Sequence, residues 1–147
     1  MKTMIGVLAA MVMAGCSAGN ADDESARETA VTWADAYFNC DYVEASQYVT
    51  EESVKWLRLA ASNTTENDLA LLREENAVVE GAEFFTSAND TLRVVQLRVS
   101  HYLAATPLGE DACLGADGLF NVTVVLRNGA WRVRMEGLPR SEKQSRD

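Results

Sequence analysis

The sequence predicts an α+β fold in which amino-terminal helices pack on a curved, cone-shaped antiparallel sheet of about four strands. Apolar residues recur at helical spacing up to residue 75; the segment 77–86 is rich in Val and Phe, and apolar residues alternate with polar ones in the segments from residue 91 onward. Asn128-Gly129 is a strong signal for a two-residue hairpin turn. Helices followed by strands are typical of this class, because a sheet with one apolar face needs helices to cover it.

The amino-terminal half is predicted to be helical. The first helix, residues 22–38, begins with acidic residues and has apolar positions at three-and-four spacing: Ala26, Ala30, Trp33, Ala34 and Tyr37. A short second helix follows Asn39-Cys40-Asp41. Thr50 is predicted to cap a third helix, and residues 66–75 form another short one. The third helix has these positions on one side: Val54, Leu57, Arg58 and Ala61.

The segments 77–86, 91–105, 119–127 and 130–136 are predicted to be strands, with a long hairpin loop over 107–117. Alternation places one set of side chains on the inner face of the second strand: Val95, Leu97, Val99, His101 and Leu103. The inner positions of the last two strands are Phe120, Val122, Val124, Leu126, Trp131, Val133 and Met135.

The amino-terminus has the pattern of a signal peptide. Lys2 precedes an apolar run over residues 4–14, which is shorter than the ~20 residues of a membrane-spanning helix. Met13-Ala14-Gly15-Cys16 resembles the lipobox of bacterial lipoproteins, although that family usually has Leu where this chain has Met13. The resemblance implies that Cys16 is acylated, becomes the new amino-terminus and anchors the chain to a membrane. The alternative is an ordinary signal peptide, cleaved near Ala18 or Ala21 without a lipid.

By the same resemblance, Ser17 after the cysteine favours the outer membrane of the cell, with the domain facing the periplasm or the cell surface. The predicted organisation is a lipoprotein signal peptide over 1–15, a flexible tether over 16–24, one α+β domain over 25–139 and a disordered tail over 140–147.

The charge balance limits the partners. The chain has 13 basic and 22 acidic residues, and removal of Lys2 leaves a formal charge of 12 − 22 = −10. Such a surface argues against binding of nucleic acid, and it disfavours anionic ligands unless arginines cluster locally.

Besides Cys16, the chain has Cys40 and Cys113, which are predicted to form a disulfide in an oxidising compartment. The alternative is two free thiols, one of them a nucleophile, but neither has a histidine beside it in the sequence. No metal site and no cofactor are predicted, because one histidine and two bonded cysteines do not make a typical ligand set.

Two segments carry a resemblance to a known fold. Residues 37–46, Tyr-Phe-Asn-Cys-Asp-Tyr-Val-Glu-Ala-Ser, and residues 128–133, Asn-Gly-Ala-Trp-Arg-Val, resemble the helix end and the closing hairpin of the nuclear transport factor 2-like (cystatin-like) fold. This fold occurs in small bacterial lipoproteins and includes isomerases, dehydratases, polyketide cyclases and non-enzymatic binding domains. The resemblance spans 22–138 and implies a cone-shaped pocket lined by Trp33, Tyr37, His101, Phe120 and Trp131.

Each candidate residue, in the predicted pocket or on the outer face of the sheet, has a purely structural alternative role. His101 is a weak catalytic candidate as a general base, or it is a histidine satisfied by one hydrogen bond. The aromatic residues either stack on a flat ligand or only fill the core. The arginines on outward strand positions either contact an acidic partner or pair with acidic residues across strands; they are Arg98, Arg127, Arg132 and Arg134.

Three functions follow as hypotheses. The first is a non-enzymatic, membrane-anchored envelope domain that binds a small apolar ligand or an envelope protein. The second is a small isomerase- or dehydratase-like enzyme that uses His101, and the third is an accessory subunit of an envelope complex. Binding is favoured over catalysis, because no inward carboxylate accompanies His101. The sequence leaves a homodimer open.

Overall fold

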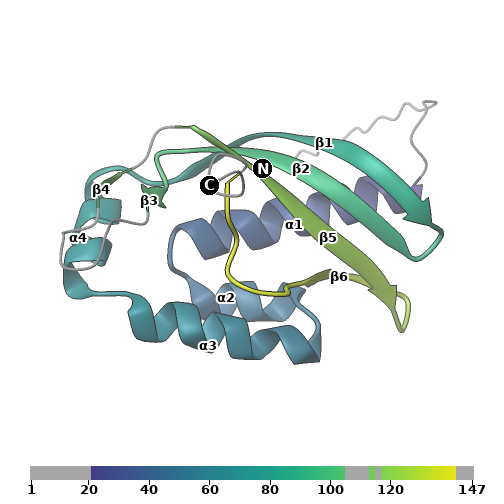
Figure 1. The fold of residues 1–147 in the computed structure, drawn as a ribbon, viewed down its shortest axis with the longest axis horizontal. Coiled ribbons are helices and arrows are strands. Elements are labelled where there is room, and N and C mark those ends of the chain that lie inside the picture. Colours follow the sequence, from purple (N-terminus) through teal and green to yellow (C-terminus); the bar gives the residue numbers. More distant parts are fainter. Residues whose placement is uncertain (1–20, 105–112, 115–116, 142–147) are drawn as a thin grey trace, which may run out of the picture.

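The computed structural model describes residues 21–104, 113–114 and 117–141 (Figure 1). Its helices are α1 (Ala21–Phe38), α2 (Tyr42–Ala45), α3 (Val54–Asn63) and α4 (Glu66–Glu74), with 3-10 turns η1 (Ser46–Tyr48) and η2 (Glu51–Ser53) between α2 and α3. The strands are β1 (Val78–Asn89), β2 (Leu92–Ser100), β3 (Leu103–Ala104), β4 (Cys113–Leu114), β5 (Gly118–Arg127) and β6 (Ala130–Arg134). The predicted α+β class is confirmed.

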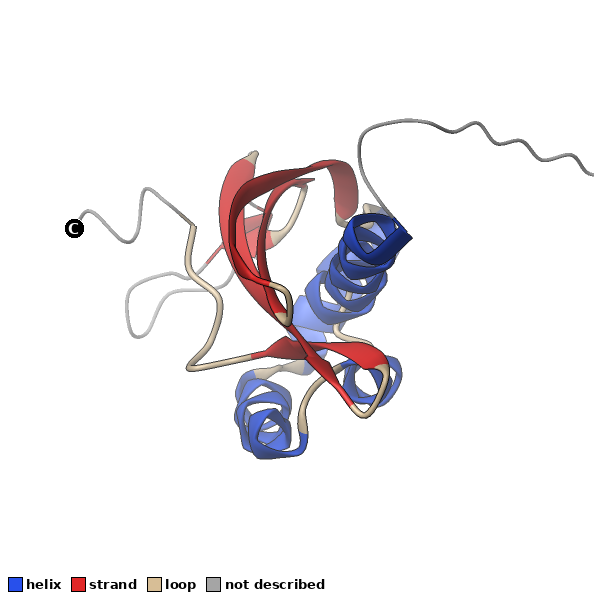
Figure 2. Cartoon of the chain, turned by 90° about the vertical axis from the view of Figure 1, so that its right-hand side faces the viewer, coloured by secondary structure: helices blue, strands red, loops and turns tan. Residues whose placement is uncertain are grey.

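The main sheet is antiparallel, with the strand order β1-β2-β5-β6, and β3 and β4 form a separate small ladder. The sheet curves, and α1 lies along its concave side, while α2 and α3 lie below (Figure 2). Asn128 and Gly129 have φ values of 52° and 80°, the left-handed conformation that the predicted turn between β5 and β6 requires.

The core lies between α1 and the concave face of the sheet. Ala26, Ala30 and Ala34 present a buried row of small side chains, and Trp33 adds one large group that is only 1% exposed. Opposite them, β2 supplies fully buried side chains from alternate positions, as predicted: Val95, Leu97 and Val99. Small residues on the helix bring its backbone close to the sheet, so that the Trp33 ring fills most of the remaining space.

The predicted second strand, 91–105, is broken into two. β2 ends at Ser100, and His101 has φ 59°, a left-handed conformation that is rare for residues other than glycine. β3 then begins at Leu103, and its partner β4 lies within the predicted loop 107–117. The prediction of one continuous strand is therefore wrong, because the reversal at His101 interrupts its alternation.

Other boundaries also differ from the predictions. Residues 21–24 form the first turn of α1, although 16–24 was the predicted tether.

The buried face of α3 also differs from the prediction. Its buried side chains are Leu57 and Ala60, whereas Arg58 and Ala61 are exposed. Ser141 is buried within the predicted tail, and the rest of that tail, 142–147, lies outside the described residues, as does the predicted signal peptide 1–15. Within the described residues, no helix is both long and apolar enough to cross a membrane.

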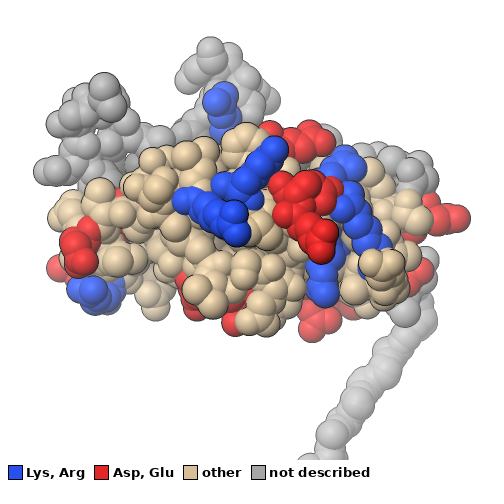
Figure 3. Space-filling model, turned by 90° about the horizontal axis from the view of Figure 1, so that it is seen from below, with Lys and Arg blue, Asp and Glu red and all other residues tan. Residues whose placement is uncertain are grey.

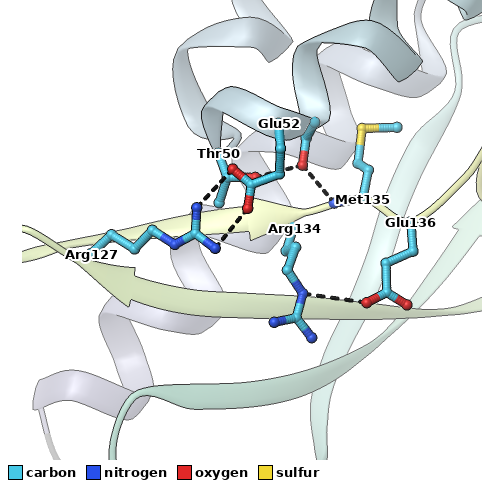
Figure 4. A network of polar contacts seen from close by, with 7 residues as sticks. Thr50, Glu52, Arg127, Arg134, Met135 and Glu136 are labelled. Carbon is cyan, nitrogen blue, oxygen red and sulfur yellow. Dashed lines mark hydrogen bonds and ion pairs between the residues drawn. The ribbon is translucent and has the colours of Figure 1, made fainter.

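The β6 edge of the sheet is tied to the segment between α2 and α3 (Figure 4). Thr50 N donates to Val133 O at 3.0 Å, and Met135 N donates to Ser53 Oγ at 2.8 Å. Thr50 was predicted to cap the helix, but its hydroxyl makes no capping hydrogen bond. The hydroxyl lies 2.6 Å from Ser53 Oγ instead. These bonds give edge-strand backbone groups a partner that an open edge would lack.

An exposed ion pair supports the same junction. Arg127 approaches Glu52 with both terminal nitrogens, at 2.7 Å and 2.6 Å, and this contact lowers the pKa of Glu52 to about 2. Both side chains are exposed to solvent, so the pair adds little to stability.

We predict that Ser53→Ala destabilises the domain by about 1–3 kcal/mol, because it leaves the buried Met135 N–H and Thr50 hydroxyl without their partner. Urea unfolding measures this loss. Ser62→Ala, which removes an exposed serine hydroxyl, is the matched control and is expected to change the unfolding free energy by no more than about 0.5 kcal/mol. Equal effects of the two substitutions would show that the Ser53 bonds do not hold the β6 edge.

Candidate functional site

Six aromatic rings meet where the carboxyl end of α1 faces the sheet, and we call them the aromatic cluster. They are Trp33, Tyr37, Phe38, Tyr42, Tyr102 and Phe120. Trp33 and Tyr37 are stacked, with ring centroids 5.1 Å apart and planes 20° from parallel. Phe38 lies 4.7 Å from Phe120, which in turn meets Tyr102 edge-on at 5.2 Å. Such offset and edge-on contacts are the favoured geometries of aromatic pairs.

The end of α1 fixes the position of the cluster. Trp33 and Tyr37 are four residues apart, so they lie on one face of the helix and can stack. The helix ends in a turn in which Cys40 has φ 63° and Asp41 N donates to Ala36 O at 2.9 Å.

Asn39 joins this turn to the start of the sheet. Its side-chain oxygen accepts from Ala77 N at 2.8 Å, and its side-chain nitrogen donates to Ala77 O at 3.1 Å. Ala77 directly precedes β1, so these two bonds hold the carboxyl end of α1 against the sheet.

The cluster has a buried base and a half-exposed rim. Trp33, Phe38 and Phe120 are buried, whereas the three tyrosines remain half-buried: Tyr37, Tyr42 and Tyr102. Within the described residues, the buried Nε1 of Trp33 has no hydrogen-bond partner. An unsatisfied buried donor is costly, so this N–H is a free polar contact inside an otherwise apolar group of rings.

Two of the rim tyrosines, Tyr37 and Tyr42, have raised pKa values. Burial raises the pKa of Tyr37 to about 12, with a further contribution from the nearby Cys40, and burial is also the main cause that raises the pKa of Tyr42. The Tyr42 hydroxyl lies 2.9 Å from Thr64 Oγ1 and donates to Cys40 Sγ at 3.4 Å. The cluster therefore presents uncharged rings and hydroxyls, which suit an uncharged ligand.

Of the predicted lining residues, the structure brings together Trp33, Tyr37 and Phe120. Trp131 is buried, but its ring lies against the guanidinium of Arg93, 5.4 Å away, and has no ring contact with the cluster within the described residues.

His101 does not face the core, contrary to the prediction. It is exposed, and its Nδ1 lies 3.2 Å from Glu75 Oε1 at the end of α4. The left-handed backbone at His101 turns its side chain outward, so the inward orientation on which its catalytic candidacy rested is absent.

Sequence reasoning missed three members of the cluster, which are Phe38, Tyr42 and Tyr102. The alternation that places His101 on the inner face places its neighbour Tyr102 on the outer face, but the reversal at His101 turns Tyr102 toward Phe120. Gly118 allows this position, because a Cβ there would lie 2.8 Å from Tyr102 Oη. A glycine directly before the predicted strand 119–127 is the feature of the sequence that permits so close an approach.

The cysteine predictions are untested by the described residues. Cys40 is half-buried, and its Sγ accepts a hydrogen bond from the Tyr42 hydroxyl at 3.4 Å. The backbone of Cys113 is described in β4 but its side chain is not, so the Cys40–Cys113 disulfide stays a prediction, and Cys16 lies outside the described residues. The described part of the chain holds no group of three or more His, Cys, Asp or Glu side chains that could bind a metal ion.

The outward arginines are partly neutralised by neighbours. Arg127 pairs with Glu52, and Arg134 Nε lies 3.5 Å from Glu136 Oε1, whereas Arg98 is exposed. On the face seen from below, an acidic group separates basic side chains, so the charges do not form a continuous basic stripe there (Figure 3).

The chain has little similarity to known proteins. No family model matches the chain. No curated protein matches it either. One solved structure, described as an "Ntf2 like protein involved in plasmid conjugation", is 17% identical, with a TM-score of 0.35. The match covers 80% of this chain and 49% of the other, so the chain spans about half of that protein's length. A likeness this low carries no argument about function.

We predict that Gly118→Ala destabilises the domain by about 1–3 kcal/mol, because the added methyl group meets the Tyr102 ring. Thermal or urea unfolding measures the change. Gly81→Ala is the matched control, since a Cβ at this strand glycine meets nothing within 4 Å, and it is expected to change stability by less than about 0.5 kcal/mol. If Gly118→Ala were as well tolerated as Gly81→Ala, the packing of Tyr102 described above would be wrong.

Proposed function

We propose that this chain is a lipid-anchored protein of the bacterial cell envelope, with a non-catalytic domain of the nuclear transport factor 2-like kind that binds an uncharged apolar group on the tyrosine rim of the aromatic cluster. The observation that carries the proposal is the half-exposed rim of Tyr37, Tyr42 and Tyr102 over a buried aromatic base. Rigid aromatic rings with polar tips are the side chains that most often anchor ligands and partners.

The chemistry of the rim specifies the ligand class. Tyrosine hydroxyls are uncharged at neutral pH, and burial raises the pKa of Tyr37 and Tyr42 further. A flat or aliphatic group could lie on these rings, and a carbonyl or hydroxyl on the ligand could accept from a tyrosine. The deeper rings leave less room, because Trp33 is 1% and Phe120 is 2% exposed. The ligand therefore belongs on the rim.

The alternatives are less well supported. An enzyme using His101 would need this side chain at the cluster, whereas it pairs with Glu75 on the surface. An accessory subunit of an envelope complex is the second candidate, and it is favoured by the burial of Trp33 and Trp131, which fill the interior with packing. In that case the same rim would receive an apolar side chain of the partner.

The membrane anchor rests on the sequence Met13-Ala14-Gly15-Cys16. α1 begins at Ala21, so the proposed acylated cysteine stands only five positions before the domain, 21 − 16 = 5. At about 3.5 Å per extended residue, this segment would hold the start of α1 within about 18 Å of the lipid.

We predict that Cys16→Ser moves the protein from the membrane fraction to the soluble fraction, because the acyl chains that replace the signal peptide can no longer be attached. Fractionation followed by immunodetection measures this. Cys40→Ser is the matched control and should stay with the membranes. A Cys16→Ser protein that remained membrane-bound would contradict the lipid anchor without affecting the proposed ligand site.

We predict that indole, used as a flat uncharged probe, shifts NMR signals of Tyr37, Tyr42 and Tyr102 in the folded protein. Tyr37→Ala should weaken this binding by roughly 3- to 10-fold, the contribution of one aromatic contact. Tyr48→Ala is the control, since Tyr48 is a half-buried tyrosine outside the cluster with its hydroxyl on Glu44. Shifts centred elsewhere, or equal effects of the two substitutions, would count against the site.

A further inference from the structure

The third helix presents a distinct face to solvent. α3 lies at the outside of the domain, below the sheet (Figures 1 and 2). Its inner face buries Leu57 and Ala60. Four exposed side chains follow one another at helical spacing along the opposite side, and we call them the α3 face: Lys55, Arg58, Leu59 and Ser62.

The α3 face is basic although the chain as a whole is acidic. The net charge of the chain is −9, but the segment 53–65 holds two basic residues and no acidic one. Within the described residues, neither Lys55 nor Arg58 forms an ion pair, whereas Glu52, just before the helix, pairs with Arg127. The two cations of the α3 face are therefore available to an anionic partner.

Apolar side chains accompany these cations. Leu59 is 40% exposed, and Val43 in the neighbouring helix α2 is 79% exposed. The ring of Trp56 is half-buried, and Lys55 Nζ lies 5.2 Å from its centre. Basic side chains next to Leu and Trp are typical of helices that lie along the interface between water and lipid.

The proposed lipid anchor would keep this helix close to a bilayer. Cys16 stands five positions before Ala21, so the start of α1 lies within about 18 Å of the lipid. α1 and α3 both begin toward the same end of the domain (Figure 1). An anionic lipid surface repels the acidic parts of the chain and attracts a face with unpaired cations.

We propose that the α3 face docks on the anionic surface of the membrane that carries the lipid anchor. Lys55 and Arg58 lie at the lipid phosphates, and Leu59 lies between the headgroups. The inference rests on the proposed anchor, which keeps the helix near the bilayer, so that a few weak contacts are enough to orient the domain. It does not depend on the proposed ligand site.

The docked orientation has a consequence for the aromatic cluster. The Tyr42 hydroxyl lies 2.9 Å from Oγ1 of Thr64, the residue that ends α3. With α3 on the membrane, Tyr42 is on the membrane side of the domain. An apolar ligand of the tyrosine rim could then reach the rim directly from the bilayer.

NMR spectroscopy of the acylated mature chain in phosphatidylglycerol nanodiscs tests the docking. The nanodiscs contain a lipid with a nitroxide on its headgroup, which broadens nearby signals. Leu59 and Val78 are similarly exposed, at 40% and 44%, but α3 and β1 lie at opposite sides of the domain (Figure 1). The methyl signals of Leu59 should be broadened at least about threefold more than those of Val78.

Two double variants separate docking from general electrostatics. Lys55→Gln with Arg58→Gln should remove the difference between the Leu59 and Val78 signals. Arg73→Gln with Arg98→Gln removes the same charge from exposed arginines outside the α3 face and should leave the difference intact.

Equal broadening of Leu59 and Val78 in the wild type, or equal effects of the two double variants, would overturn the proposal. The α3 face would then remain for an acidic protein partner.

A failure of the anchor is recognised separately, because the intact mass of the chain then shows no acyl group. In that case the unmodified chain should co-sediment with phosphatidylglycerol vesicles at low salt at least about tenfold more strongly than Lys55→Gln with Arg58→Gln. Equal co-sedimentation of the two proteins would overturn the docking of the α3 face.

Discussion

The close packing of α1 on the concave face of the sheet is the constraint on which the rest of the structure depends. The row of Ala26, Ala30 and Ala34 brings the helix backbone near β2, and Trp33 fills the space that remains. A larger side chain at an alanine position would lift the helix and separate rings that now touch. The helix and the sheet are therefore close together along the alanine row, and the large side chains lie toward the two ends of α1.

Those two ends differ in chemistry. At the carboxyl end, Asn39 holds the turn to Ala77, and neutral aromatic rings meet beside it. At the amino end, Asp23 holds the first turn to a buried arginine. The first link consists of neutral hydrogen bonds to the backbone, while the second is an ion pair between side chains.

Periodicity predicted the class of the fold and the burial of Trp33 and Phe120, and the Asn-Gly dipeptide predicted the turn at residues 128 and 129. It failed at His101, because a single residue in the left-handed conformation reverses the alternation of a strand, and this also hid Tyr102. Phe38 and Tyr42 flank a turn whose path depends on the Asn39 bonds, which no local pattern reveals. Arg93 is in phase with Val95, but a charged side chain at an inward position is not expected without the distant Asp23.

The central claim is that the aromatic cluster binds a ligand and is more than packing. Native mass spectrometry of the mature chain, purified gently from its own host and compared with the Tyr37→Ala variant prepared in the same way, tests this claim most directly. We expect the wild type to carry an additional small, uncharged mass that is released on denaturation and is depleted in the variant. A wild-type chain whose mass is the same under native and denaturing conditions would contradict the claim and leave the cluster a structural core.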